Sequence, residues 1–408
     1  MHSPLLTPSN PTAAQDAKTI ALVSAAHGTS HFFHLILAPL FPWLKIEFNL
    51  SYVQLGLLMT VFFTVSGIGQ AMAGFVVDRV GPRVVMLCAV AGFSFSALLL
   101  SFAPNYAVLM LGATLAGAAN SVFHPVDFSI LNHRVSPARL AYAFTAHGLS
   151  GNLGWAIATG LLAGVAAWVG WREALQAAAL LAAGVWALLW WGRDALYVAP
   201  SLGAKAAVQG EAKVGTFAFL GSSTLWFCFA FFALATMGLS GFQTFGSTIL
   251  AAQYGFSQAL ASQIITVYLV CGAVGMVAGG WLATRIARND RQIAMAYGFS
   301  ALGACTIALN WVPVWLALFF IALLGFAYGL AGPSRDMLIK RATPKGAVGR
   351  MYGVVYSGAD VGFAVGPILC GYLVDNGANT AVFWAIAAFQ ALAIACAWQV
   401  GSRQAARP

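Results

Sequence analysis

Ionisable and amide side chains recur at helical spacing inside apolar stretches of the chain. Two triplets share a spacing of four and then three residues: His27, His31 and His34, and Asn120, His124 and Asp127. At 100° per residue, each triplet falls on one face of a helix. Histidine gains and loses a proton near neutral pH, and a partly desolvated carboxylate beside it can titrate in the same range. The two triplets therefore indicate a proton relay.

Further titratable residues lie at a similar depth in their apolar stretches. A helix rises 1.5 Å per residue, so the number of residues from the nearer charged end of a stretch gives the depth of a side chain. Four residues lie about 12–16 Å deep by this measure: His27, His124, His147 and Asp360. Because a bilayer core is about 30 Å thick, this depth is close to its middle. Four helices would then bring a titratable group to the level where a transporter binds its substrate and coupling ion.

The second half of the chain adds a cation and a tyrosine stripe. Tyr352, Tyr356 and Asp360 share one helical face, and Arg335 could meet an anionic substrate group or act as an interfacial anchor. Asp336 follows Arg335 directly. Because consecutive helical side chains point about 100° apart, we expect these two charges to pair with other helices and not with each other.

Each of these residues also has a structural interpretation. A single histidine can bond a backbone carbonyl or a Ser/Thr hydroxyl of a neighbouring helix. Asp127 lies about five residues from the end of its stretch, so it could instead brace a nearby loop through Arg79 or Arg83. The spacing of these residues is compatible with both interpretations.

The composition makes lipid the solvent for most of the chain. Of 408 residues, 60% are hydrophobic and 8% are charged, whereas globular domains carry roughly a quarter charged residues. Apolar stretches of about 20 residues must cross the bilayer as helices. This excludes soluble enzymes, nucleic-acid binders and outer-membrane barrels. The six cysteines show no CxxC spacing, so neither a disulfide framework nor a zinc ribbon is indicated.

Twelve apolar stretches are long enough to be spans. We predict them at about 19–44, 51–77, 84–103, 107–132, 140–168, 172–192, 217–252, 257–284, 292–311, 313–338, 349–374 and 378–400. With this assignment, all 20 Lys and Arg residues except Lys45 and Arg172 fall on the side that holds both termini. The positive-inside rule then makes both termini cytoplasmic, in the inner or plasma membrane, and it accounts for the net charge of +9 without a nucleic-acid partner.

The predicted fold class is an all-α integral membrane protein with 12 transmembrane helices in two six-helix bundles. A charged, weakly hydrophobic stretch divides the halves, and a faint repeat relates Asp127 to Asp336 and Gly148 to Gly358. Glycines at Gly358, Gly362 and Gly366 predict close helix packing. The expected parts are a cytoplasmic tail at 1–18, a bundle at 19–193, a cytoplasmic linker at 194–216, a bundle at 217–400 and a cytoplasmic tail at 401–408.

A loop between the second and third predicted spans carries a family signature. Its residues resemble the loop signature of the major facilitator superfamily, G-x-x-x-D-[RK]-x-G-[RK]-[RK], with Pro82 in place of a basic residue: Gly74, Asp78, Arg79, Gly81 and Arg83. The resemblance implies a transporter that works by alternating access, and it gives these residues a gating role. A tight reversal, a carboxylate at a helix N-terminus and paired cations would close the cytoplasmic face.

Motifs in the first half narrow the resemblance. His27-Gly28, the run Val122 to Pro125 and His147-Gly148 are similar to the fosmidomycin-resistance branch of that superfamily. This resemblance implies proton-driven efflux of small drug-like or phosphonate compounds by antiport, and hence drug resistance. The expected partners are a small-molecule substrate, protons and the lipid bilayer, with no cofactor and no nucleic acid, and the chain is expected to be a monomer.

Two other functions compete with export. One is proton-coupled uptake of an organic anion, or of a transition metal held by His27, His31, His124 and Asp127, although no Cys or Met lies on these stripes. The other is a membrane enzyme with histidine boxes, which need more histidines than the seven in this chain. A phosphate-binding loop of the G-x-x-x-x-G-K-[ST] type is absent from the sequence, so we expect an ion gradient to drive transport.

Overall fold

In the computed structural model, the described residues are 12–198, 221–283, 285–286, 288–309, 312–342 and 348–405. The predicted linker 194–216 and the outer parts of both predicted tails therefore lie mostly outside the described residues. Within them the regular elements are helical. They are α1 (Ala13–His34), η1 (Ala38–Leu40), α2 (Phe41–Phe48), α3 (Tyr52–Val80), α4 (Pro82–Ser101), α5 (Tyr106–Asn120), α6 (Phe123–Arg134), η2 (Pro137–Arg139), α7 (Leu140–Trp168), α8 (Trp171–Trp191), η3 (Arg193–Leu196), α9 (Ser223–Tyr254), α10 (Gln258–Ala283), α11 (Asn289–Ala308), α12 (Val314–Ala342), α13 (Val348–Asp375) and α14 (Asn379–Ala405).

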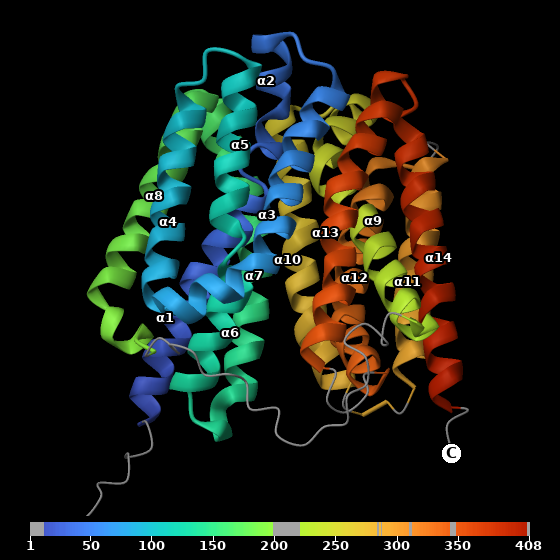
Figure 1. Cartoon of the computed structure of the whole chain (residues 1–408). Helices are drawn as coiled ribbons and strands as arrows, with labels where there is room; N and C mark the ends of the chain where they lie inside the picture. The colour runs from blue at the N-terminus through green and yellow to red at the C-terminus, as the bar shows by residue number, and fades with distance from the viewer. Residues whose placement is uncertain are drawn as a thin grey trace, which may run out of the picture.

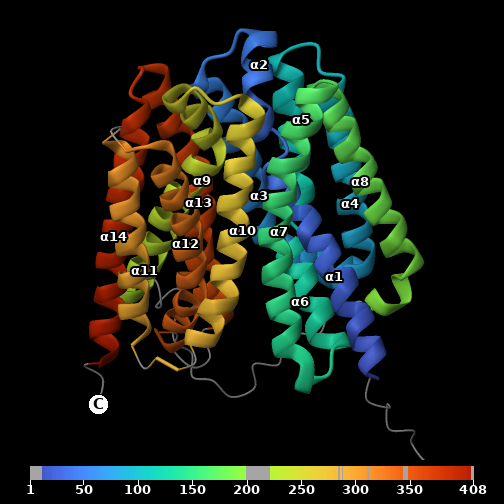
Figure 2. The same ribbon diagram turned by 180° about the vertical axis from the view of Figure 1, so that it is seen from behind.

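The helices form two bundles side by side (Figure 1). Helices α1 to α8 make the N-terminal bundle and α9 to α14 make the C-terminal bundle. The view from behind shows the same arrangement, with α3 beside α13 and α7 beside α10 where the bundles meet (Figure 2). The end at which α1 begins and α14 ends is called the terminal face below, and the opposite end, where α2 lies, is called the distal face.

The number of membrane-crossing segments agrees with the sequence. Eleven segments of the described chain are long and apolar enough to cross a membrane, with α1–α2 and α5–α6 each forming one segment. Helix α11 adds a twelfth long helix and packs between α12 and α14. Its first residues, Asn289 to Gln292, are polar, which lowers its mean hydropathy. The predicted all-α membrane fold is confirmed.

The first predicted span is wrong as a single helix. Helix α1 begins at Ala13, capped by the Thr12 hydroxyl, and ends at His34, where 19–44 was expected to be continuous. The chain then turns through η1 into α2. Pro39 and Pro42 explain the break, because proline lacks the N–H for the helical bond and its ring collides with the carbonyl four residues earlier. The break comes immediately after the histidine stripe.

The fourth predicted span is also interrupted. Helix α5 ends at Asn120 and α6 starts at Phe123, so the predicted helix 107–132 is two helices joined by a turn. Pro125 removes the bond that the carbonyl of Ser121 would receive. Discontinuous helices in transporters expose backbone groups near the middle of the bilayer, where substrates and ions bind.

Glycines bring α1 and α7 into direct backbone contact. A Cβ atom on Gly154 would lie 2.1 Å from the carbonyl oxygen of Gly28, and one on Gly151 would lie 2.8 Å from the ring of His31. A side chain at either position would push the two helices apart. This crossing therefore sets how closely the histidines of α1 approach α7.

The glycine stripe of α13 has the packing role that its spacing predicts. A Cβ on Gly358 or Gly362 would lie 2.4 Å from a backbone oxygen of α9, and one on Gly366 would lie 2.4 Å from the hydroxyl of Ser240. Helices α9 and α13 thus touch along their small residues. In lipid no hydrophobic effect drives helices together, so close van der Waals packing between small residues holds them instead.

Gly154→Ala should weaken the α1–α7 crossing. The added methyl group would overlap a backbone oxygen that cannot move aside, so we expect the free energy of unfolding to fall by about 1–3 kcal/mol. Gly164→Ala on the same helix is the matched control, because a Cβ there meets nothing within 4 Å, and it should be neutral or slightly stabilising. Unfolding in mixed micelles measures both. Equal stability of the two variants would contradict the account.

Candidate proton and substrate site

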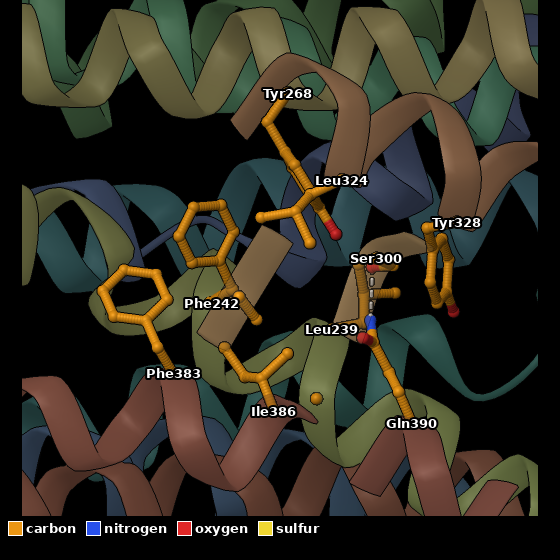
Figure 3. Close-up of a pocket in the computed structure, with 11 residues that line it drawn as sticks. Leu239, Phe242, Tyr268, Ser300, Leu324, Tyr328, Phe383, Ile386 and Gln390 are labelled. Carbon is orange, nitrogen blue, oxygen red and sulfur yellow. Dashed lines mark hydrogen bonds between the residues drawn. The ribbon is translucent and has the colours of Figure 1, made fainter. Parts of the chain in front are cut away.

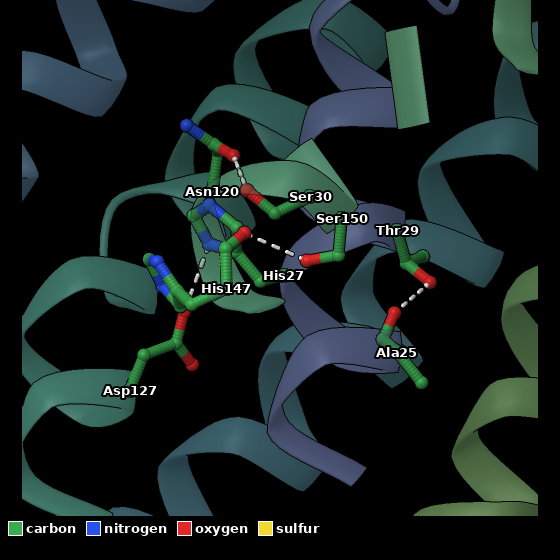
Figure 4. A network of polar contacts seen from close by, with 8 residues as sticks. All are labelled: Ala25, His27, Thr29, Ser30, Asn120, Asp127, His147 and Ser150. Atoms are coloured by element: carbon green, nitrogen blue, oxygen red, sulfur yellow. Dashed lines mark hydrogen bonds and ion pairs between the residues drawn. The ribbon is translucent and has the colours of Figure 1, made fainter. Parts of the chain in front are cut away.

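A fully buried carboxylate stands at the centre of the N-terminal bundle. Asp127 on α6 has no exposed surface, and its Oδ2 lies 3.0 Å from Nδ1 of His27 on α1 and 3.0 Å from Nε2 of His147 on α7. Figure 4 shows the three side chains converging from their separate helices. A buried charge of this kind is stable only when it is paired and hydrogen-bonded. The two imidazoles provide that pairing.

The imidazoles pack against one another around this carboxylate. The rings of His27 and His147 are stacked, with centroids 3.5 Å apart and an interplanar angle of 25°. The ring of His124 lies 5.5 Å from that of His27 and 6.2 Å from that of His147. Two buried polar atoms around this carboxylate have no hydrogen-bond partner among the described residues, Nδ1 of His124 and Oδ1 of Asp127, and Nδ1 of the neighbouring His31 has none either. The imidazole nitrogens can donate or accept one bond according to the tautomer, whereas the oxygen of an ionised carboxylate can only accept.

Three ring nitrogens of the cluster are close enough together to hold a metal ion. One ring nitrogen from each of His27, His124 and His147 can be chosen so that all three lie within 4.8 Å of one another. The orientation of the rings is less suitable, because the stacked His27 and His147 each direct a nitrogen at the same carboxylate oxygen. Those nitrogens serve as donors to Asp127, which leaves the opposite ring atoms for any other ligand.

The remaining histidines of α1 continue the cluster toward the distal face. The ring of His31 lies 4.5 Å from that of His27 and 4.5 Å from that of His34. The indole Nε1 of Trp155 on α7 donates to Nδ1 of His34 over 3.2 Å. Because an indole N–H can only donate, Nδ1 of His34 must accept, and this imidazole is neutral with its proton on Nε2.

An amide and two hydroxyl groups form a second, adjoining network. Ser30 on α1 donates to Oδ1 of Asn120 over 2.7 Å, and Nδ2 of Asn120 donates to the hydroxyl of Ser66 on α3 over 2.8 Å. Asn120 is the last residue of α5, directly before the turn into α6. The network therefore fixes the helix break relative to α1 and α3.

The structure brings together seven of the predicted site residues and sets the others apart. His27, His31, His34, Asn120, His124, Asp127 and His147 lie in the connected networks described above. The bracing interpretation of Asp127 does not describe this conformation, since its bonds go to His27 and His147 and not to Arg79 or Arg83. Arg335, Asp336, Tyr356 and Asp360 all belong to the C-terminal bundle.

The expectation that Arg335 and Asp336 pair with other helices is wrong. Nε of Arg335 donates to Oδ1 of Asp336 over 3.0 Å. The long arginine side chain spans the 100° between successive residues and lies over the ring of Phe232, with Cζ 4.6 Å from its centroid. The ring of Tyr356 is 4.9 Å from the same phenylalanine. The side chain of Tyr352 lies outside the described residues.

Asp360 lies at the boundary between the two bundles. A Cβ on Gly67 of α3 would be 3.2 Å from the Cβ of Asp360, so the acid packs on that helix. Its carboxylate has no hydrogen bond or ion pair with any residue that the structure describes. An unpaired acid at the junction of the bundles is a second candidate for binding a proton.

The loop with the family signature is reduced to a single glycine. Gly81, with φ 90°, joins α3 to α4 and takes a backbone conformation that favours glycine, as the predicted tight reversal requires. Cζ of Arg83 lies 4.9 Å from the ring of Tyr197. Asp78 and Arg79 are exposed, and a Cβ on Gly74 would meet nothing within 4 Å among the described atoms. Among the described residues, the predicted pairing across this face is not made in this conformation.

The bundles touch along their distal halves. The contacts between α3 and α13 run from the distal end to mid-membrane, through Thr60 with Ala364, Phe63 with Phe363 and Gly67 with Asp360. Helices α7 and α10 meet through the hydroxyls of Thr159 and Thr266, 2.9 Å apart. Beyond this level Gly74 and Asp78 lack such contacts in the described part of the chain. The bundles also touch below mid-membrane, where Nδ2 of Asn152 lies 3.5 Å from Sδ of Met276. The conformation is therefore closed at the distal face, and the ribbons of the two bundles diverge toward the terminal face (Figure 1).

A small cavity inside the C-terminal bundle is separate from these residues (Figure 3). It lies among α9, α10, α11, α12 and α14 and is walled by aromatic and aliphatic side chains. Gln390 donates to the hydroxyl of Ser300 across it over 2.7 Å, while Oε1 of Gln390 is buried with no hydrogen-bond partner among the described residues. The cavity shares no lining residue with the histidine cluster.

Two helical bundles that lie side by side, one of them enclosing a buried polar cluster, form a fold that solved transporter structures share. A solved bacterial homolog of the human lysosomal transporter Spinster, in an inward-facing and occupied conformation, has a TM-score of 0.74 to this chain at 15% identity, and the match covers 97% of this chain and 98% of the other. The family profile described as Major Facilitator Superfamily matches residues 23–308 and also residues 234–407. The chain belongs to the major facilitator superfamily.

Curated relatives place the chain among transporters of small molecules. The probable nitrate/nitrite transporter NarK2 of Mycobacterium tuberculosis is 25% identical over 336 residues, 81% of this chain and 82% of the relative. The hexuronate transporter of Bacillus subtilis is 23% identical over 358 residues, 82% of each. The fosmidomycin resistance protein of Escherichia coli is 28% identical over 136 residues, only 33% of each. The chain is a multi-pass membrane protein and a secondary transporter, and its resemblance to the fosmidomycin-resistance branch is partial.

Sequence reasoning missed three residues that hold the cluster in place. Trp155 sets the tautomer of His34, and Ser30 and Ser66 hold the two ends of the Asn120 amide. Trp155 follows His147 by eight residues, which puts both on one helical face, so the spacing could have indicated it. The serines carry no such signal, because isolated hydroxyl groups are common in membrane helices.

The bond between Asp127 and His147 can be measured with a double-mutant cycle. His147→Leu and Asp127→Asn should each lower the free energy of unfolding by about 1–3 kcal/mol. Together they should cost less than the sum by at least about 1 kcal/mol, because each removes the same interaction. Unfolding in mixed micelles gives the four values.

The control cycle uses His133→Leu with Asp127→Asn. His133 is exposed on the same helix as Asp127, and its Nδ1 lies 2.7 Å from the carbonyl of Ser129. This pair should be additive within about 0.5 kcal/mol. Additivity in the His147 cycle as well would mean that the buried contact contributes nothing.

Proposed function

We propose that this protein is a proton-coupled secondary transporter of the inner or plasma membrane that exports a small anionic or drug-like compound. The observation that carries the proposal is Asp127, a fully buried carboxylate bonded to His27 and His147. In this assignment the terminal face is cytoplasmic, and the chain works as a monomer. The transport cycle alternates between a conformation open at this face and one open at the distal face.

Charge explains why the cluster would carry a proton. With Asp127 ionised and its three neighbouring imidazoles neutral, the cluster has a charge of −1, and one added proton makes it neutral. The titratable groups that face Asp127 are His27 on α1, His124 on its own helix and His147 on α7. A neutral cluster costs less to hold in a closed, water-poor state than a charged one. Closing the site would therefore depend on the number of bound protons.

The C-terminal bundle supplies the candidate substrate groups. Arg335 is partly exposed on the same bundle as Asp360 and would attract an anionic group, with Asp336 and Tyr356 nearby. The curated relatives named for nitrate/nitrite and for hexuronate support an anionic cargo. The partial similarity to the fosmidomycin resistance protein supports export.

The gating role belongs to the loop at the terminal face. Asp78, Arg79 and Arg83 lie where the two bundles are apart. When the terminal face closes, Asp78 would approach a helix N-terminus of the other bundle and the arginines would pair with acids there. Gly74 and Gly81 leave room for that approach.

Uptake of an organic anion is the alternative, and electrostatics separates it from export. A proton bound to the cluster favours the binding of an anion nearby. If proton and substrate strengthen each other's binding in this way, they bind together and uptake follows. Export by antiport requires that substrate and proton disfavour each other's binding, and this linkage is reciprocal. The sign of the coupling therefore decides the direction.

A transition-metal cargo is favoured by one observation, the approach of His27, His124 and His147. The stacked rings and the bonds to Asp127 weigh against it. Calorimetric titration with zinc or nickel distinguishes a metal cargo from an organic one. Binding of one metal ion per protein molecule that is lost in His124→Gln would favour the metal cargo.

Proton flux in proteoliposomes tests the proposal. The protein is reconstituted with a pH-sensitive dye inside, and nitrate, glucuronate and fosmidomycin are added in turn. For at least one of them we expect substrate-dependent proton movement opposite to the substrate, reduced at least about tenfold in Asp127→Asn.

Two outcomes would change the assignment. Proton movement in the same direction as the substrate would replace export by uptake. Transport that proceeds equally well without a proton gradient and in Asp127→Asn would contradict proton coupling at this cluster. Asp360→Asn, tested in parallel, shows whether the acid at the boundary between the bundles carries the proton instead.

A further inference from the structure

An acid of the C-terminal bundle caps a helix of the N-terminal bundle at the distal face. Oδ1 of Asp375 accepts the backbone N–H of Tyr52 over 2.8 Å, and Oδ2 accepts that of Val53 over 2.8 Å. Asp375 is the last residue of α13, and Tyr52 and Val53 are the first two of α3. One carboxylate thus joins the two bundles through two hydrogen bonds.

These bonds complete the N-terminus of α3. The first four N–H groups of a helix have no partner within it. The hydroxyl of Ser51 accepts the N–H of Gln54, and Oε1 of Gln54 accepts the N–H of Ser51. Asp375 accepts the remaining two, from Tyr52 and Val53. Separating the bundles at this face would leave two N–H groups of α3 without a protein partner.

The position of Asp375 on its own helix strengthens this interpretation. A carboxylate at a helix C-terminus faces the negative end of the dipole, which is unfavourable, whereas the N-terminus of α3 attracts it. The nearby charges lie on α2. Nζ of Lys45 is 4.3 Å from the ring of Tyr52 and bonds the carbonyl of Leu50, and Glu47 pairs with Arg172 over 3.1 Å. None of these pairs joins the two bundles.

We propose that Asp375 is a latch that holds the distal face closed and biases the transporter toward the conformation open at the terminal face. Its bonds exist only while the ends of α3 and α13 are together. Opening the distal face must break them, so the latch stabilises one of the two access states and not the fold of either bundle. This inference concerns the balance between conformations and does not depend on substrate or on protons.

Distance measurements between the bundles test the latch. Spin labels are attached to cysteines introduced at Ile46 and Trp315, whose side chains are 84% and 70% exposed near the distal face in the N-terminal and C-terminal bundles, in a background without the six native cysteines. Pulsed electron paramagnetic resonance in nanodiscs then gives the fraction of molecules with a long distance. In Asp375→Ala we expect the ratio of distal-open to distal-closed molecules to rise about fivefold.

The matched control is Glu47→Gln, which removes a carboxylate on the same face whose partner lies within one bundle. It should leave the distance distribution unchanged. Asp375→Asn keeps the shape of the side chain, so it should fold even if Asp375→Ala does not, and it should shift the ratio in the same direction. A distribution in Asp375→Asn identical to that of the unmodified protein would overturn the latch. A change of equal size in Glu47→Gln would overturn it as well.

Discussion

A carboxylate with no access to water can be kept in a membrane bundle only if other side chains replace its hydration. Asp127 meets this constraint with His27 and His147, each 3.0 Å from the same oxygen. An unpaired charge at this depth would destabilise the bundle by several kcal/mol. Three helices must therefore approach one point, and much of the N-terminal bundle follows from that requirement. The glycine crossing of α1 with α7 allows the approach, and the turn between α5 and α6 ends five residues before Asp127.

The same constraint links the site to the movement of the bundles. The cluster lies wholly in the N-terminal bundle, whereas Asp360 and Arg335 lie in the C-terminal bundle. Substrate bound between them would contact both, so its affinity and the charge of the cluster would influence each other. The bundles are held together at the distal face by small residues and by Asp375, and they are apart near Asp78. Rocking of one bundle against the other would break the distal contacts and bring the two bundles together near Asp78.

The sequence was sufficient for those features that depend on local patterns. Apolar length and charge placement predicted the helices, and the i, i+4 and i, i+3 spacings placed the histidines with Asp127. Proline positions could have indicated the breaks after His34 and Asn120, but a proline alone does not reveal which packing compensates for it. The pairing of Arg335 with Asp336 depends on Phe232, which is more than 100 residues away. The contact of Asp360 with Gly67 and the donation from Trp155 to His34 likewise depend on tertiary packing, which a helical period does not specify.

Substrate affinity measured against pH in detergent tests the central claim most directly. With a transported anion identified, its dissociation constant is determined between pH 5 and 9 for the unmodified protein, Asp127→Asn and Asp360→Asn. The account predicts that affinity changes with pH in the unmodified protein and in Asp360→Asn, and that the dependence disappears in Asp127→Asn while binding itself persists. The amide cannot take up a proton, and without the carboxylate as a counter-charge the buried imidazoles stay neutral. Identical pH profiles in the unmodified protein and Asp127→Asn would contradict it.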